Sequence, residues 1–162
     1  MKKMLFFFVA LAAMLAVGCD DDYSPSATMS ADFQQTYPNA VDVEWERKHG
    51  HIVAEFKLPG VSNDCEAWFT KDGTWVLTTF DISKSELPAA VLNAFESAYG
   101  AVTPVADVTL VKRSNGDDIY FIEIETIVDN QLVDLFLDYT PQGELLRTWV
   151  EVEWTENIYY YL

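Results

Sequence analysis

Apolar and polar residues alternate along two long stretches of the chain, 33–80 and 95–154. Alternation with a period of two is typical of β-strands that bury one face. Each stretch contains four such strands separated by turn residues, and each begins with the end of a segment that has the apolar spacing of a helix. The pattern therefore predicts a helix followed by a four-stranded antiparallel meander, twice, in an α+β fold.

The expected strands are 41–46, 52–58, 65–69 and 74–80 in the first set, and 105–112, 119–128, 132–139 and 144–154 in the second. Asp72-Gly73 lies between the last two strands of the first set and supplies the positive φ that tight hairpin turns need. The fourth strand of the first set is ambiguous, because either Trp75 and Leu77 or Val76 and Phe80 can point inward.

Two helices are expected, each with recognisable ends. Ser30 can cap the first helix, which continues to about Thr36 and stops before Pro38. The second helix opens at Pro88, because proline is tolerated in a first turn, and Gly100 ends it.

The two sets align with each other, which indicates an internal repeat. Residues 33–37 align with 95–99 at an offset of 62, and from Ile52 onward the offset is 70. The offset changes only where loops are expected. One copy of about 55 residues would be marginally stable, so we expect two tandem repeats that share one core. The predicted division is a lipoprotein signal peptide at 1–18, a flexible acidic tether at 19–29, a first α+β repeat at 30–82, a second at 83–154 and an aromatic tail at 155–162.

The first residues have the pattern of a secretory signal. Lys2 and Lys3 precede an apolar run of 14 residues, 4–17, which is short for a membrane span and ordinary for the hydrophobic region of a signal. The run exits through small residues to Cys19, and this exit resembles a bacterial lipobox. The resemblance implies cleavage before Cys19 and a lipid anchor on that cysteine. The alternative is an ordinary secretory signal followed by an unrelated cysteine.

Three aspartates, 20–22, follow this cysteine directly. The cluster resembles the signal that exports Bacteroidetes lipoproteins to the outer face of the outer membrane. In enterobacterial lipoproteins, aspartate at this place instead resembles an inner-membrane retention signal. We therefore expect a lipoprotein of a Gram-negative cell envelope, anchored in the outer membrane and either periplasmic or surface-exposed. The structural alternative for the aspartates is a solvated linker.

Acidic residues dominate the composition, with 26 Asp and Glu against 10 Lys and Arg and a formal net charge of −16. Cleavage before Cys19 would remove two lysines, so the mature chain would carry 8 − 26 = −18. This charge disfavours nucleic acid as a partner, because the phosphate backbone would be repelled. Half of the residues are hydrophobic, so the acidity does not indicate disorder.

The sequence contains no recognisable catalytic or cofactor motif. His49 and His51 are the only histidines and could hold a metal ion weakly, but no third ligand stands at a characteristic spacing, so we expect a solvated turn. Cys65 aligns with Leu135 at an apolar strand position, which favours a buried and inert thiol. Nucleophile and phosphate-loop motifs are missing from the sequence. We therefore predict no catalytic residue, no metal and no cofactor.

The order of these elements resembles that of the PepSY-like family, also described as beta-lactamase-inhibitor-like periplasmic proteins. The resemblance rests on Tyr37-Pro38-Asn39-Ala40 between the first helix and an acidic alternating strand, and on Leu87-Pro88-Ala89-Ala90-Val91, which is similar to the family's inter-repeat motif. It covers roughly residues 30–154, and the second copy departs from it at 100–102. The resemblance implies a tandem α+β architecture, a secreted location and no catalytic residue. Inhibition of an enzyme is suggested only by the namesake of the fold.

Strand alternation also predicts a face for a partner. If Ile52 and Ala54 point toward the helix, a second set of residues points to the opposite side of the sheet: Glu66, Trp68, Phe121, Glu123, Asp134, Phe136 and Asp138. Large aromatic side chains dominate interface energetics. We therefore predict Trp68, Phe121 and Phe136 as anchors inside an acidic rim of Glu66, Asp134 and Asp138. The alternative is that the tail or packing between the repeats covers these aromatic side chains.

These observations predict a non-catalytic module that binds a protein or peptide with basic and apolar residues, such as an envelope enzyme that it inhibits or escorts. A structural envelope component without a dedicated ligand is one alternative. An uncharacterised hydrolase is the other, and it would have to use a histidine or a pair of carboxylates.

Overall fold

The computed structural model describes residues 23–60, 64–128 and 130–150. The helices are α1 (Ala27–Thr36), the short 3-10 helix η1 (Lys84–Glu86) and α2 (Ala89–Tyr99). The strands are β1 (Val41–Lys48), β2 (His51–Lys57), β3 (Cys65–Phe69), β4 (Trp75–Asp81), β5 (Asp107–Arg113), β6 (Ile119–Val128), β7 (Gln131–Tyr139) and β8 (Leu145–Val150). The predicted element order and the α+β class are confirmed. The predicted signal peptide, Cys19, the aromatic tail and the end of the last predicted strand lie outside the described residues.

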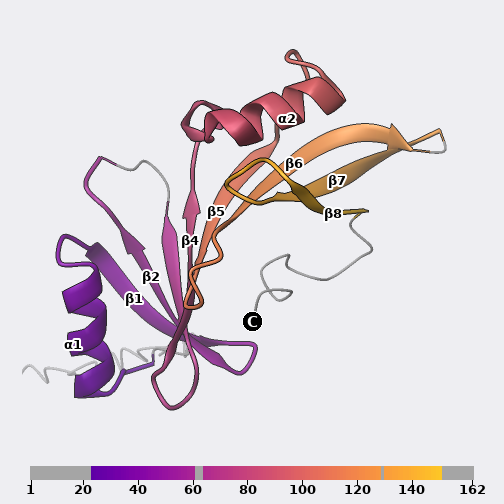
Figure 1. Ribbon diagram of the computed structural model, residues 1–162. Helices are drawn as coiled ribbons and strands as arrows, with labels where there is room; N and C mark the ends of the chain where they lie inside the picture. The colour runs from indigo at the N-terminus through magenta and orange to yellow at the C-terminus, as the bar shows by residue number, and fades with distance from the viewer. Residues whose placement is uncertain (1–22, 61–63, 129, 151–162) are drawn as a thin grey trace, which may run out of the picture.

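All eight strands form one antiparallel sheet in which each strand pairs with the next along the chain. The two expected meanders are joined where β4 pairs with β5, with Thr79 opposite Val111. Figure 1 shows the sheet bending strongly, with α1 and α2 on its outer side. We call the other, inner side the open face, because neither α-helix of the described chain covers it.

The first α-helix starts three residues before the expected cap at Ser30. Ser26 is the N-cap, and its side-chain oxygen accepts a hydrogen bond from the backbone N–H of Met29 at 3.2 Å. Met29 is buried in the resulting first turn, so the earlier start gains an apolar contact as well as a cap. The predicted tether at 19–29 is therefore too long at its C-terminal end. Tyr23 is also tied to the sheet, because its backbone N–H donates to the Trp45 carbonyl.

Each α-helix packs on its own half of the sheet. Phe33 of α1 packs with Phe56 of β2 at a ring-centroid distance of 5.1 Å, within a cluster that also contains Cys65 and Phe69. Phe95 of α2 packs in a separate cluster on strands β5 to β7.

A third cluster lies on the open face and joins the halves. It contains Val53, Trp68 and Leu77 from the first half, and Val111 and Ile119 from the second. The core of the described chain is thus divided into three clusters, and the cluster with buried residues from both halves lies on the open face.

A β-bulge resolves the ambiguity of β4. Trp68 pairs with Leu77, whereas Phe69 pairs with Trp75, so one extra residue stands in β4. Trp75 therefore packs with the α1 cluster, and Leu77 turns to the open face. The second half has a bulge at the same place, between β7 and β8. This correspondence supports the tandem repeat, which stays a prediction.

Candidate partner-binding face

The register of the sheet places the predicted partner-face residues together. Directly opposed residues of an antiparallel pair point to the same side. Trp68 is opposite Val53, Phe136 is opposite Glu123, and Asp138 is opposite Phe121. All of these residues lie on the open face, because they alternate along the strands with Ile52 and the other residues that point toward α1.

Trp68 lies in the first half of this face and is 0% exposed. The Lys48 ammonium covers its ring, with Nζ 5.7 Å from the centroid. Glu66 holds both residues: its Oε1 accepts from Lys48 Nζ at 3.1 Å, and its Oε2 accepts from Trp68 Nε1 at 3.0 Å. The lysine thus neutralises the carboxylate and shields the indole ring from solvent.

The second half has a stack of three aromatic rings. Phe136 lies between Phe121, at a centroid distance of 5.3 Å, and Trp149, at 4.5 Å. Beside the stack, Asp138 Oδ2 accepts from Arg147 Nε at 2.8 Å and lies 2.7 Å from Arg147 Nη2. The Asp138 side chain is only 3% exposed. This two-point contact fixes the guanidinium, whose carbon lies 5.4 Å from the Trp149 centroid.

The predicted anchors are therefore not exposed in this structure. Phe121 is 5% exposed and Phe136 is 2% exposed. Alternation determines the side of a sheet that a residue faces, but it does not determine what covers that side. A direct role of Trp68, Phe121 and Phe136 in binding would require the face to rearrange. In the structure as described, these residues stabilise it.

Sequence reasoning missed the residues that shield the aromatic rings, namely Lys48, Arg147 and Trp149. The available signal was their strand parity. Lys48 follows Glu44 and Glu46 on the same side of β1, and Arg147 and Trp149 are two apart on β8. The bulge before Arg147 adds one residue to β8, so alternation counted from the turn assigns Arg147 and Trp149 to the wrong side of the sheet.

Carboxylates run across the open face. By register, this face holds four cationic residues: Lys48, Lys57, Arg113 and Arg147. It holds ten acidic residues: Glu44, Glu46, Glu55, Glu66, Asp81, Asp107, Glu123, Glu125, Asp134 and Asp138. From β1 to β5, six of these acidic residues face three of the cations. There the negative charge is only partly neutralised within the described chain.

The crowding changes how individual carboxyls titrate. Burial, followed by the charges of Asp107, Glu66 and Asp64, raises the pKa of Asp81 to about 6. Burial also raises the pKa of Glu55, and the neighbouring Glu46 adds to the effect. Burial contributes most to both shifts and the neighbouring like charges add to it, so a cation arriving at this face would offset part of the cost of ionising these carboxyls.

The groups considered for metal or thiol chemistry are His49, His51 and Cys65. Within the described ranges, no group of three or more His, Cys, Asp or Glu side chains has the arrangement of a metal site. Cys65 is fully buried. Burial, followed by the charges of Asp81 and Asp64, raises the pKa of its thiol to about 11. Such a thiol is a poor nucleophile at neutral pH.

The model of the family of beta-lactamase-inhibitor-like, PepSY-like proteins matches residues 53–147. This chain belongs to the PepSY-like family. The resemblance drawn from the sequence is thereby confirmed. Among curated proteins, none matches this chain.

Three crystal structures of Bacteroides proteins resemble this PepSY-like chain. A DUF2874 family protein from Bacteroides ovatus is 33% identical, with a TM-score of 0.69 over 79% of this chain and 89% of its own. A protein from Bacteroides eggerthii, described as a putative periplasmic protein, is 30% identical, with a TM-score of 0.67 over 79% of this chain and 89% of its own. A BLIP-like protein from Bacteroides fragilis is 26% identical, with a TM-score of 0.71 over 83% of this chain and 92% of its own.

The family and the fold favour a non-catalytic binding module for this PepSY-like protein. Neither α-helix in the part of the chain that the structure covers is long and apolar enough to cross a bilayer.

Proposed function

We propose that this PepSY-like protein is a non-catalytic binding module of the cell envelope, and that its open face takes a basic protein or peptide. An envelope enzyme that the protein inhibits or escorts would be such a partner. The observation that carries the proposal is the row of carboxylates from β1 to β5, whose charges are only partly compensated. The BLIP-like neighbour and the family name add support for an inhibitor-type role.

The structure suggests how such a partner would be recognised. Glu44 and Asp107 are exposed on the two sides of the row, and Glu55 and Asp81 lie half-buried between them. Lysine or arginine side chains of a partner would meet carboxylates that already repel one another, so binding would relieve that repulsion. The net charge of the whole chain would also speed the encounter with a cationic surface.

The test is affinity capture from an envelope extract at low and high salt, with the wild type and two charge variants. The first variant, Glu44→Gln with Asp107→Asn, removes two charges from the open face. The matched control, Asp32→Asn with Glu144→Gln, removes two exposed charges from α1 and from the turn before β8. Carboxylates suit this test because alanine at buried Trp68 or Phe136 would perturb folding as well as binding.

We expect the wild type to capture a defined basic protein, and high salt to weaken that capture. The open-face variant should bind roughly 2- to 30-fold more weakly, since each exposed ion pair contributes about 0.2–1 kcal/mol. The control variant should match the wild type. Equal binding by all three proteins would show that the open face is not the site. It would favour a structural envelope component instead.

We further propose that the mature protein is anchored in the outer membrane through lipid on Cys19. The support is the basic start, the apolar run and the cysteine that ends it. Labelling cells with a palmitate analogue should mark the wild type and spare the Cys19→Ala variant. Equal labelling of both proteins would show that Cys19 does not carry the lipid. Protease treatment of intact cells would distinguish surface display from a periplasmic location.

The tandem repeat is also part of the proposal. Its support is the paired bulges and the matching turns, in which Gly73 N–H donates to the Thr70 carbonyl and Gly143 N–H donates to the Thr140 carbonyl, both at 2.9 Å. Residues 83–162 expressed alone should be poorly stable, because the third cluster would lose its first-half members. A highly stable and cooperative fragment would indicate two independent domains.

A further inference from the structure

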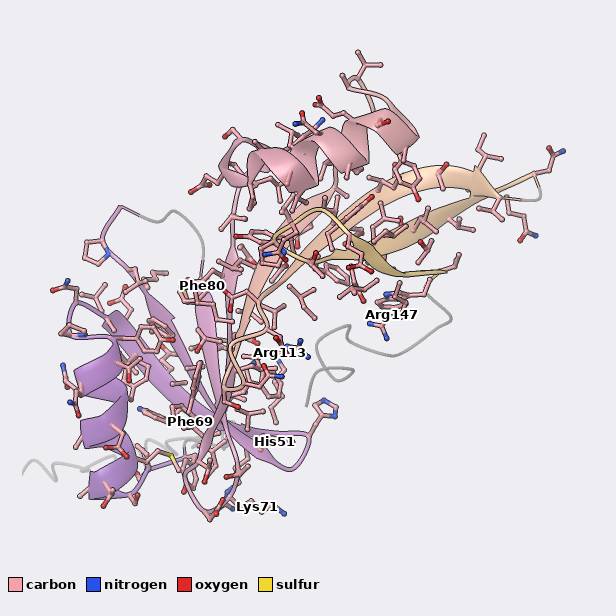
Figure 2. The ribbon with its side chains drawn as sticks, viewed as in Figure 1. His51, Phe69, Lys71, Phe80, Arg113 and Arg147 are labelled. Carbon is pink, nitrogen blue, oxygen red and sulfur yellow. The ribbon has the colours of Figure 1, made fainter. Side chains whose placement is uncertain are left out.

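A cavity of about 450 Å³ lies at the turn end of the first half of the sheet, away from the acidic row. It is lined by Tyr23, Arg47, Gly50, His51, Ile52 and Lys71. This volume falls within the usual range for small-molecule sites. Figure 2 shows His51 and Lys71 at this same end of the sheet.

Three separate segments meet at the cavity for local reasons. The two-residue turn at His49 and Gly50, both with positive φ, closes the β1–β2 hairpin and sets Arg47 opposite Ile52. Lys71 comes from the β3–β4 turn. Tyr23 is held by its hydrogen bond to Trp45, and the Arg47 guanidinium carbon lies 4.8 Å from the Tyr23 ring centroid.

The charge of this cavity differs from that of the rest of the chain. Of the eight basic residues in the described ranges, five form ion pairs with carboxylates: Lys48, Lys57, Lys84, Arg113 and Arg147. Arg47 and Lys71 have no such partner among the described residues, and both line the cavity. Asp72, although next to Lys71, directs its carboxylate to the Thr70 hydroxyl. The protein is strongly acidic, yet this cavity holds two cationic side chains that form no ion pair with a carboxylate among the described residues. Such a cavity favours the binding of an anion.

His51 also lines the cavity, but its ring belongs to the open face, because His51 pairs with Lys48 and its ring centroid lies 6.2 Å from that of Trp68. The two cationic side chains therefore carry the case for an anion.

We propose that this cavity binds the phosphate group of an organic phosphate. The Arg47 fork and the Lys71 ammonium would hold the phosphate oxygens, and the Tyr23 ring and Ile52 would contact the organic part. The phosphate can come from a soluble metabolite or from a phospholipid headgroup. Only the headgroup source rests on the proposed anchor: Tyr23 is 23 − 19 = 4 residues from Cys19, at most ~14 Å of extended chain.

The test uses the unlipidated mature chain, residues 19–162. Glycerol 3-phosphate is titrated into it by calorimetry, and vesicles of phosphatidylethanolamine and phosphatidylglycerol are co-sedimented with it. The variants are Arg47→Gln and Lys71→Gln. The control is Lys112→Gln, because Lys112 is exposed and also has no described carboxylate partner, but lies on β5 outside the cavity. Circular dichroism verifies that each variant is folded.

We expect saturable binding of glycerol 3-phosphate that weakens about tenfold or more in each cavity variant and stays unchanged in the control. Binding of vesicles with the same dependence identifies the headgroup as the source, and binding of glycerol 3-phosphate alone identifies a soluble phosphate. Absence of saturable binding, or an equal loss in Lys112→Gln, overturns the proposal. Binding that appears only when Asp20, Asp21 and Asp22 are changed to Asn also overturns it, because the chain's own carboxylates would then be the occupants.

Discussion

Gly143 lies in the turn between β7 and β8, where the sheet touches α2. Its φ is +83°, and a Cβ added there would stand 2.5 Å from the Ala90 carbonyl oxygen and 2.8 Å from the Ala90 carbonyl carbon. Gly116 has the same φ of +83°, but its Cβ would meet nothing within 4 Å. Alanine substitution at these two glycines therefore separates the cost of the backbone conformation from the cost of the contact with the helix.

The expected magnitudes follow from this difference. Left-handed backbone costs alanine about 1 kcal/mol relative to glycine, part of which is offset by the lower entropy of the unfolded chain. Gly116→Ala should therefore lose about 1 kcal/mol or less. In Gly143→Ala the added methyl group meets helical backbone that cannot rotate away, which adds about 1–3 kcal/mol. The total loss should be about 2–4 kcal/mol.

The assay is urea unfolding of the mature chain, followed by tryptophan fluorescence. The free energy of unfolding is compared at similar m-values, so that a change of midpoint reports stability. Equal losses in the two variants would refute the reasoning. They would show that the turn does not press on the start of α2.

Three further outcomes follow from the open face and the core. Burial and like charges raise the pKa of Asp81 from 3.8 to about 6, so ionisation of this carboxyl opposes folding. Wild-type stability should therefore fall as the pH rises from about 4 to about 6. Urea unfolding should show that Asp81→Asn is more stable than the wild type at pH 7 but not below pH 4. Cys65 should react with a thiol reagent such as Ellman's reagent only slowly in the native protein and at once in urea, and rapid native labelling would contradict its burial. Arg147→Met should lower the free energy of unfolding in urea by about 2–3 kcal/mol, because it leaves the Asp138 carboxylate buried without its cation. The loss should not be larger, since Arg147 itself is partly solvated. The double variant Arg147→Met with Asp138→Leu should recover much of that loss, and an unchanged single variant would argue against the pair.

Much of the fold could be predicted from local pattern. The two helices, the eight strands and the positive-φ turn at Gly73 follow from periodicity and turn chemistry, which act over a few residues. The wrong start of α1 and the ambiguity left in β4 also have local causes. The start of α1 depends on whether Ser26 or Ser30 provides the cap, and only the burial of Met29 decides between them. The inward side of β4 depends on one bulged residue, which shifts parity without changing composition.

The site was harder to predict because exposure depends on contacts between distant strands. Alternation placed Trp68 and Phe136 on the correct side of the sheet. It could not show that Lys48, twenty residues away in sequence, lies over Trp68, or that Trp149 stacks on Phe136. The joining of β4 to β5 is equally non-local, and it creates the open-face cluster that links the halves.

The central claim is that a basic partner binds the acidic open face, and carboxylate footprinting of the captured complex tests it most directly. Exposed carboxyls are labelled with an amine in the free and bound protein, and modification is measured by mass spectrometry. The account predicts that the partner protects Glu44 and Asp107, which are exposed on the open face, and leaves Asp32 on α1 as reactive as in the free protein. Protection of Asp32, with Glu44 and Asp107 labelled equally in both states, would contradict it.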